Sequence, residues 1–553
     1  MLVPRLASRR LPALAALSPL LVCGHAFAQT QDPPKPQDPP YHYEPVHSRY
    51  LRLDPFDRYG RRRAWNPLTL SDGTGDYPII GSAGLFDVYN TNKWKGDLPL
   101  VGENIFFAGE LISTNLFEAR DKAGADSETE IRSTEFLTAE LFHGDTVFRP
   151  PTWRVRANVA LDFRDVENNN LSGFDNDAAV QELFAEALLW DMDPYLDFGS
   201  IRVGRQAFAS DFRNFIFVDN NDGVQLFGSL NESKIDYQIA FFDLVAKDPV
   251  SNLNRGFEDR EQTFFAANVF FEDLLATGYK IEFTVQWAHD TSGNFVDSAA
   301  NQINPTVDAY YVGFNGDGRI GGLEVAHALY WMTGKDDFNI IGDQFLVPEN
   351  VGKQDINAYM AAVEIAVPDN WRRYVFSGLY ASGDDDPFDG KGKGFDSVFD
   401  NPNFAGGAFG YFHRQAINAG NIGGAGVNLV NTNSFYPNLR TKANNAPNSV
   451  NPGLIILHAG CEADLSNYWA VNFNASYLHF ADTGVLEALS PTGDSISASF
   501  GVDLSLAAEW RPFGVDNVIV TPGIQGLFST GGLEDLTGDT ALGALFLNAV
   551  IIL

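Results

Sequence analysis

Residues 152–164 read Thr-Trp-Arg-Val-Arg-Ala-Asn-Val-Ala-Leu-Asp-Phe-Arg, and apolar and polar side chains alternate along them. Side chains of an extended strand point alternately to its two faces, so the apolar and polar residues separate onto opposite faces. Trp153 and Phe163 are ten residues apart, which is roughly 33 Å at about 3.3 Å per residue. A strand tilted by roughly 40–45° converts this length to about 24 Å, close to the ~25 Å apolar band of an outer-membrane barrel. The stretch therefore predicts a transmembrane strand with an aromatic ring at each interface.

The same spacing recurs near the C-terminus, where Phe500 and Trp510 begin and end an alternating segment. The four predicted interface aromatics are thus Trp153, Phe163, Phe500 and Trp510. We expect an all-β fold, a single transmembrane antiparallel β-barrel of about 18 strands, with 16 as the alternative because barrels of this kind have even strand numbers. The clearest strand-like segments are 131–142, 152–164, 180–190, 196–208, 232–246, 261–272, 278–289, 356–367, 372–382, 454–464, 467–480, 496–511 and 516–529.

The N-terminus has the pattern of an export signal, in which arginines precede an apolar run and Ala26-Phe27-Ala28 forms an A-x-A cleavage site. We therefore expect localisation to the outer membrane after removal of a signal peptide. The predicted organisation is a signal peptide at 1–28, a proline-rich linker at 29–40, an irregular periplasmic extension or plug at 41–103, and the barrel at 104–553. Within the barrel, the long loop 383–452 can fold inward as a constriction.

Composition excludes several classes of protein. The formal charge of −33 becomes −36 once the three arginines of the leader are removed, and such acidity argues against a nucleic-acid partner. Cys461 is the only cysteine after the leader, so an intramolecular disulfide is excluded. The expected partners are outer-membrane lipids and a small hydrophilic solute, with a homo-oligomer or a periplasmic partner contacted through residues 29–103 as further alternatives.

Motifs for catalysis are missing from the sequence, which has no Gly-x-Ser-x-Gly, His-Glu-x-x-His or phosphate-binding glycine loop. A barrel enzyme would need a histidine such as His458 or His479 beside an outward serine, and the sequence suggests no such pair. Residues 313–324 imitate a calcium loop but begin with glycine, so a hairpin turn at 315–318 is the better interpretation. The acidic residues of 384–389 could bind a hard cation, although a solvated turn is favoured. We expect no cofactor and no enzymatic activity.

If the barrel closes, the polar faces of its strands line the lumen, where charges act strongly on permeating solutes. Arg154, Arg156 and Arg202 could form a basic rung that favours anions, or a ladder paired with carboxylates that only stiffens the wall. Arg205 breaks the alternation, so it lies either beyond the apolar band or on a bulge at Gly204. The candidate lumen residues are Arg154, Arg156, Arg164, Arg202, Lys234, Lys280, Glu282, Asp503 and Glu509.

Three stretches carry a resemblance to a known family. Ile201-Arg202-Val203-Gly204-Arg205-Gln206 leads to Asn221-Asp222-Gly223, Ser382-Gly383-Asp384-Asp385-Asp386-Pro387 precedes a long loop, and Gly501-Val502-Asp503-Leu504 runs into Trp510-Arg511-Pro512. These short motifs resemble bacterial outer-membrane porins of the alginate-export type over roughly residues 105–553. The resemblance implies a porin-like channel for passive passage of small hydrophilic solutes, anionic or saccharide. The alternatives are a plugged or partner-filled structural barrel and a barrel enzyme.

Overall fold

The structure, a computed structural model, describes residues 95–552 except 103, 145–149, 169–171, 192–196, 294, 297–301, 338–352, 423–427, 438, 440–446, 467, 491–492 and 513–517. The predicted signal peptide, the linker and most of the 41–103 extension therefore lie outside the described residues. The end of that extension forms β1 (Lys95–Val101), which pairs with the first strand of the barrel.

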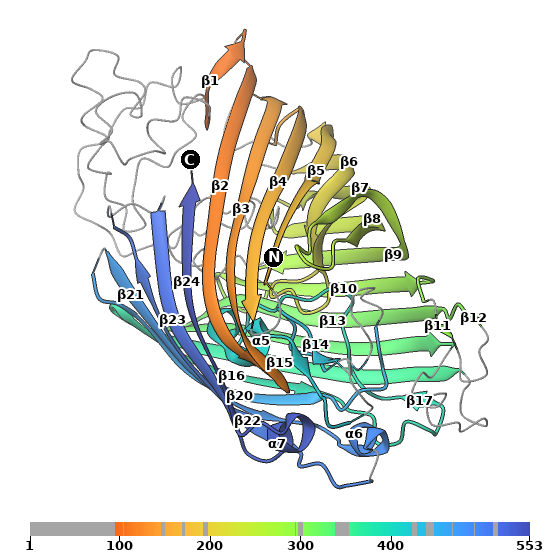
Figure 1. The fold of residues 1–553 in the computed structure, drawn as a ribbon. Helices are drawn as coiled ribbons and strands as arrows, with labels where there is room; N and C mark the ends of the chain where they lie inside the picture. The colour runs from red at the N-terminus through yellow and green to blue at the C-terminus, as the bar shows by residue number, and fades with distance from the viewer. Residues whose placement is uncertain are drawn as a thin grey trace.

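Among the described residues, one antiparallel sheet closes into an 18-stranded ring because its last strand pairs with its first (Figure 1). This confirms the predicted barrel and the higher of the two strand counts. The ring strands are β2 (Ile105–Lys122), β3 (Ala125–His143), β4 (Trp153–Asn168), β5 (Ser172–Asp191), β6 (Phe198–Ala209), β7 (Val218–Leu230), β8 (Ile235–Lys247), β9 (Asn254–Glu272), β10 (Tyr279–Asp290), β13 (Val307–Ile320), β14 (Leu323–Asp336), β15 (Gln354–Asp369), β16 (Arg372–Ala381), β20 (Leu454–Asp464), β21 (Trp469–His479), β22 (Ser499–Trp510), β23 (Val518–Ser529) and β24 (Ala541–Ile552).

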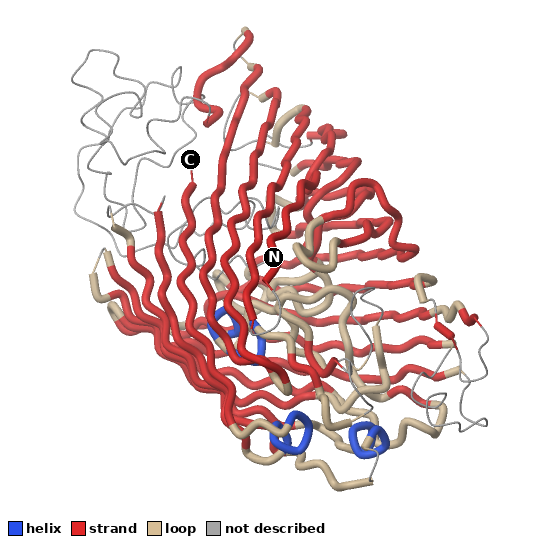
Figure 2. The backbone as a smooth tube through the Cα atoms, viewed as in Figure 1, coloured by secondary structure: helices blue, strands red, loops and turns tan. Residues whose placement is uncertain are grey.

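The remaining elements are short and sit in the connections, as Figure 2 shows for the helices. No helix among the described residues is long and apolar enough to cross a bilayer. These elements are β11 (Phe295–Val296), β12 (Gln302–Ile303), β17 (Lys391–Gly392), β18 (Ile417–Asn418), β19 (Asn428–Val430), η3 (Gly407–Phe409), α5 (Tyr411–Arg414), α6 (Gly484–Leu489) and α7 (Gly532–Thr537).

The two ends of the barrel differ in their connections. At the end where β2 begins and β24 ends, the connections span two residues (321–322) to nine (144–152). The opposite end holds the connection 382–453 between β16 and β20. Short turns on one side and long loops on the other are typical of bacterial barrels, whose short turns face the periplasm.

The turn predicted at 315–318 is wrong. These residues lie inside β13 and pair continuously with β10 and β14, and the chain reverses at Gly321-Gly322 instead. The sequence misled because Gly316 and Gly318 look like turn residues. A side chain at Gly316 would collide with Tyr279 and His327, since a Cβ there would lie 2.4 Å from the Tyr279 hydroxyl. Glycine is needed here for close packing on the strand, not for a reversal.

The outer face of the ring carries exposed apolar side chains all the way round. Each of the eighteen strands carries at least one large apolar side chain with more than 36% of its surface exposed, for example Val155 on β4 (46%), Val312 on β13 (44%) and Leu545 on β24 (49%). On a water-soluble protein such a band would promote association, whereas in a bilayer it is the expected lipid-facing surface. We call it the outer apolar belt.

Candidate functional site

The barrel interior is the candidate site, and its first part is the inward face of β2–β6, which we call the ionic wall. Glu186 on β5 lies at its centre, 2.7 Å from Arg154 and 2.8 Å from Arg202. The Arg202 guanidinium also stacks over the rings of Phe184 and Phe227, at 4.7 and 5.1 Å from their centroids. Two arginines therefore share one carboxylate in a largely buried setting.

The pairing continues along the wall. Arg156 lies 2.7 Å from Glu182 and 3.1 Å from Glu140, and Arg164 lies 2.8 Å from Glu130. Towards the long-loop end, Arg120 contacts Glu118, Glu128 and Glu130 at 2.5–2.8 Å, and Arg132 contacts Asp162 at 2.7 Å. All six inward arginines of β2–β6 are thus held by carboxylates.

Part of this wall remains open to water. The side chains of Arg132, Arg154 and Arg164 keep 22–24% of their surface exposed although they face the interior. Since these side chains point away from the outer apolar belt, the exposed surface borders a hydrated space inside the barrel. The geometry favours the paired ladder over an unpaired basic rung, because every arginine is matched by at least one carboxylate.

The other inward candidates also have partners. Lys280 contacts Asp236 at 2.9 Å and also contacts Glu272. Glu282, fully buried, accepts a hydrogen bond of 3.0 Å from Asn315. On β22, Glu509 accepts a hydrogen bond from Asn472 at 3.0 Å and contacts Arg511 at 3.2 Å.

Two sequence predictions are wrong in placement. Lys234 is not on the wall: it ends the exposed turn 231–234, whose first three residues adopt left-handed backbone angles (φ 59–60°), so β8 begins at Ile235 and not at the predicted residue 232. Phe500 is not an interface aromatic. The register between β21 and β22 shifts beside it, which leaves Phe500 as an extra residue that is turned inward and fully buried against Phe412. Phe163 (44% exposed) and Trp510 (39%) do lie on the outer face, and Trp153 is partly exposed there.

Arg205 lies on the outer face, and the bulge proposed at Gly204 is absent. The pairing of β6 runs without a shift from Gly204 to Arg205, which sits beside the outward residues Leu183 and Asp222. Asp222 pairs with the guanidinium at 2.8 Å, and the ring of Phe257 covers it at 4.9 Å. The β5–β6 pairing ends at this residue.

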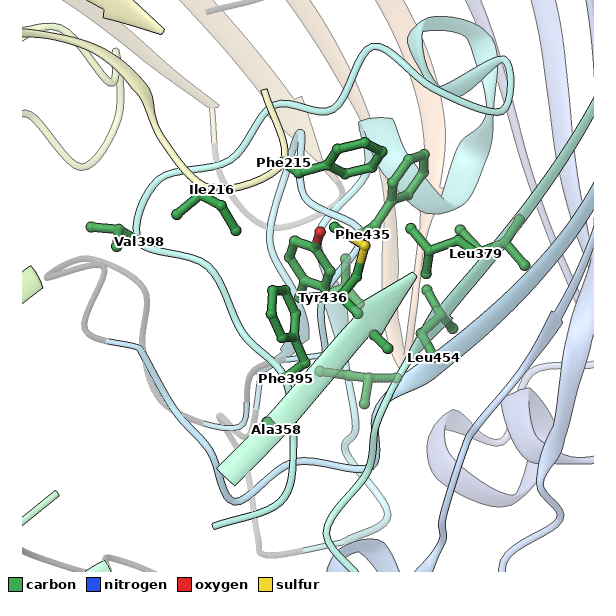
Figure 3. Packing of buried hydrophobic residues seen from close by; sticks show 14 of the residues in the cluster. Phe215, Ile216, Ala358, Leu379, Phe395, Val398, Phe435, Tyr436 and Leu454 are labelled. Atoms are coloured by element: carbon green, nitrogen blue, oxygen red, sulfur yellow. The ribbon is translucent and has the colours of Figure 1, made fainter. Parts of the chain in front are cut away.

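The second part of the interior is the inward face of β8–β16, which carries most of the large apolar cluster together with some buried polar side chains such as Glu282, and which we call the apolar wall. It is covered by the described residues of two connections, 210–217 and 382–453, which we call the inner loops. Phe217 stacks on Phe264 of β9 with 4.2 Å between ring centroids, and Phe395 packs on Tyr311 of β13 at 6.1 Å. Figure 3 shows the same cluster around Tyr436, with Phe395 and Phe435 on either side. The described part of the connection 382–453 therefore folds into the barrel and packs on the apolar wall.

The inner loops are tied internally by buried carboxylates that accept backbone and hydroxyl groups. Asp211 accepts from the backbone N–H groups of Arg213 and Phe215 at 2.9 and 3.0 Å, and burial raises the pKa of its carboxyl. Asp400 accepts from the hydroxyls of Ser397 and Ser434 at 2.6 and 2.8 Å. These hydrogen bonds give buried polar groups of the loops the partners that water would provide at an exposed surface.

The inner loops also reach across to the ionic wall. Arg414 at the end of α5 lies 2.7 Å from Glu118 on β2, and its guanidinium stacks over Phe546 at 4.2 Å. Asp503 on β22, predicted as a lumen residue, instead accepts the backbone N–H of Phe412 at 2.7 Å. Neighbouring His413 is fully buried, and burial lowers its pKa to about 4. The loops thus bridge the interior from one wall to the other.

The acidic turn at 384–389 does not gather its carboxylates around one point. Lys393 contacts both Asp385 and Asp389, whereas Asp384 is fully buried, and burial raises the pKa of its carboxyl to about 7. Among the described residues, no group of three or more His, Cys, Asp or Glu side chains has the geometry to hold a metal ion.

A serine–histidine pair exists that the sequence did not suggest. His458 Nδ1 lies 3.1 Å from the Ser476 hydroxyl, but both side chains face inward, opposite to the outward Leu457 and Phe473. Asp503, an acid beside Ser476 in the register, accepts the backbone N–H of Phe412. The outward arrangement that a barrel lipase would require is therefore not formed by this pair.

Comparison with known proteins gives a likeness of fold only. No protein-family model and no curated protein sequence matches the chain. Solved structures with a similar backbone include Acinetobacter baumannii OccAB3 (8% identity, TM-score 0.47, 81% of this chain and 99% of that one) and Pseudomonas aeruginosa OccK5 (9%, 0.46, 81% and 98%). The P. aeruginosa outer membrane protein OpdK is another (10%, 0.45, 80% and 98%). We take no residue role from them.

Proposed function

We propose that the protein is an outer-membrane channel through which small hydrophilic solutes pass passively along the ionic wall. One observation carries the proposal: a closed ring has an apolar belt on every strand outside and a partly hydrated ionic face inside. Closure satisfies every backbone group of the wall without water, which is what a bilayer demands. A ring of this size is wide enough to leave an aqueous lumen where nothing fills it.

The paired wall favours uncharged polar solutes, such as saccharides, over anions. Every inward arginine of β2–β6 contacts a carboxylate, so the wall presents alternating donors and acceptors with no excess positive charge. Such a surface can exchange hydrogen bonds with hydroxyl groups along its length. Alginate is a polyanion and therefore falls outside this class, and it rests only on the resemblance of three short motifs.

A plugged barrel is the second candidate, and the inner loops favour it. They pack on the apolar wall and reach Glu118 on the opposite side, so the free path is confined to the space beside the ionic wall. A structural role would follow if that space were too narrow for solutes.

Purified full-length protein in planar bilayers separates the two candidates. The channel proposal expects stepwise conductance, together with swelling of protein-containing liposomes in a neutral disaccharide. Silent bilayers from protein that still shows heat-modifiable migration on gels would contradict the channel and favour the plugged barrel.

A further inference from the structure

A hydrogen-bonded polar cluster lies on the outer face of β2 and β3. Ser113 donates to Glu135 Oε1 at 2.8 Å, and the Ser133 hydroxyl lies 3.0 Å from the same oxygen and 2.8 Å from Asn115 Oδ1. Asn115 donates to the Ser113 hydroxyl at 2.9 Å. We call these four residues the polar cluster.

The polar cluster sits inside the outer apolar belt. On β3, Glu135 is flanked on the same face by Ile131 and Leu137, which are 55% and 46% exposed. Its neighbour on β4 is Leu161, another outward residue. The inward residue next to it, Thr134, instead bonds Asp162 of the ionic wall. The carboxylate therefore points towards lipid, where a charged group without a partner is costly and usually marks a functional contact.

Several small residues lie near the polar cluster on the same outer face. In the register of β2–β4, Gly109, Ala139 and Ala157 lie side by side, and Ala549 of β24 lies beside Asn115. The outer face of the opposite side carries Tyr310, Trp331, Tyr359 and Tyr380, each at least 43% exposed. Small residues with polar side chains among them permit close approach of another protein surface within a membrane, whereas bulky aromatics suit lipid.

The hydrogen bonding of the polar cluster is incomplete and self-complementary. Glu135 Oε1 receives both serine contacts, while Oε2 accepts no hydrogen bond from the residues that the structure describes. The Asn115 amide uses one of its two N–H groups within the cluster. One acceptor and one donor are therefore left over, diagonally placed on neighbouring strands, since Asn115 lies opposite Ser133 and Glu135 opposite Ser113.

We propose that the polar cluster is the centre of an interface with a second copy of this chain. A two-fold axis would place Asn115 of each copy against Glu135 of the other. The symmetric contact would then contain two equivalent hydrogen bonds, each from the unused Asn115 N–H of one copy to Glu135 Oε2 of the other. In a partner of different sequence, symmetry would not supply an acceptor for Asn115 and a donor for Glu135. The proposal requires the outer apolar belt to lie in lipid, but it does not require the pore to conduct.

Cross-linking in lipid tests the interface directly. In a Cys461→Ser background, Ala139→Cys places a thiol beside the small residues Gly109 and Ala157 on this outer face without replacing a residue of the polar cluster. The matched control is Ala361→Cys, which faces outward on β15 between Tyr359 and Val363. With a short bis-maleimide in proteoliposomes, the Ala139→Cys chain should give a dimer band at least five-fold stronger than the Ala361→Cys chain. Equal bands, or no dimer band, would overturn the proposal.

A second variant tests the role of the carboxylate. Glu135→Leu in the Ala139→Cys chain should reduce the dimer band at least five-fold while heat-modifiable migration stays, because leucine suits lipid; Glu135→Gln should keep the dimer. An unchanged dimer band in Glu135→Leu would overturn the proposal, as would native mass spectrometry showing lipid or a different protein on a monomer. Bilayer conductance reports separately on the channel, so a silent dimer would contradict only the proposed function.

Discussion

The ionic wall of β2–β6 and the apolar wall of β8–β16 belong to one continuous sheet, yet their inward side chains are stabilised in different ways. The ionic wall satisfies its charges with each other, as where Glu186 holds Arg154 and Arg202, and keeps contact with water. The apolar wall cannot face water, and the inner loops cover it with rings such as Phe217 on Phe264. The ionic wall therefore borders the proposed solute path, whereas the apolar wall holds the inner loops that narrow this path.

Removing the larger inner loop should have the largest effect. The backbone N–H of Gly394 bonds the carbonyl of Ser449 at 2.8 Å, so residues 395–448 can be replaced by a Gly-Gly linker without moving the loop base. Single-channel conductance should rise several-fold, because the space over the apolar wall would fill with water.

The control for this deletion inserts two glycines between Gly321 and Gly322, at the short-turn end of the barrel, and should leave conductance as it is. An unchanged conductance in the deletion, with the barrel folded, would mean that the inner loops do not narrow the path. The two walls would then not differ in function.

Breaking the ionic wall should cost stability instead. Glu186→Gln leaves Arg154 and the 2%-exposed Arg202 without their shared counter-charge, and unpaired buried charges of this kind cost about 3–5 kcal/mol. Denaturant unfolding in detergent micelles measures the loss.

Asp369→Asn is the matched control, since it breaks the half-exposed Asp369–Arg372 pair at 2.7 Å, where about 0–1 kcal/mol is expected. Equal losses in the two variants would show that the ionic wall is as hydrated as the surface.

The strands could be predicted from the sequence because side-chain alternation is a local signal. It located β4, β22 and the closing strands, and it placed Arg154 and Arg202 on one face. It failed where pairing with a neighbour decides, as in the extra residue Phe500, the late start of β8 after Lys234 and the in-strand glycines of β13.

The inner-loop anchors could not be predicted in the same way. Asp211, Asp400 and Arg414 come from irregular segments, and their partners lie far away in the sequence, as with Arg414 and Glu118. The aromatic density of residues 211–217, Asp-Phe-Arg-Asn-Phe-Ile-Phe, was the one local signal that this loop is buried. The sequence left carboxylate pairing open as one of two alternatives for the arginines, because the pairing depends on the register across three strands.

Substitutions on the outer face should have similar effects behind the ionic wall and behind the apolar wall, because the strands of both walls turn apolar side chains to lipid. Val159→Arg behind the ionic wall and Val312→Arg behind the apolar wall should each cost about 2–4 kcal/mol near the bilayer midplane, with conductance little changed. Unfolding in lipid vesicles compares them. A much smaller cost for Val159→Arg would indicate that this side is not in lipid.

The base of the larger inner loop should loosen as pH rises. Burial raises the pKa of Asp384 from 3.8 to about 7, partly offset by the backbone N–H of Asp386. A folded-state pKa above the unfolded value means that protonation favours the packed loop, so this stabilisation is complete below about pH 4 and is lost as pH rises through about 7.

Hydrogen exchange of residues 382–398, corrected for intrinsic rates, should therefore show less protection at pH 8 than at pH 5. Asp384→Asn, which resembles the protonated form, should remove the difference. If the difference in protection between pH 5 and pH 8 persists in Asp384→Asn, another titrating group causes it. The pH dependence would then not come from the loop base that packs on the apolar wall.

The smallest effect is expected from a charge-neutral change in the ionic wall. Arg156→Gln alone removes the arginine that lies 2.7 Å from Glu182 and leaves Glu140 with only the 3.8 Å contact to Arg154. The reversal potential in a salt gradient should therefore move towards cations. Arg156→Gln combined with Glu182→Gln removes one charge of each sign, and the reversal potential should stay at the wild-type value because a paired arginine contributes no net field to the lumen. A cation shift in the double variant as large as in the single one would mean that Arg156 acts on solutes as a free charge. The ionic wall would then be a basic rung after all, and the preference for uncharged solutes would give way to one for anions.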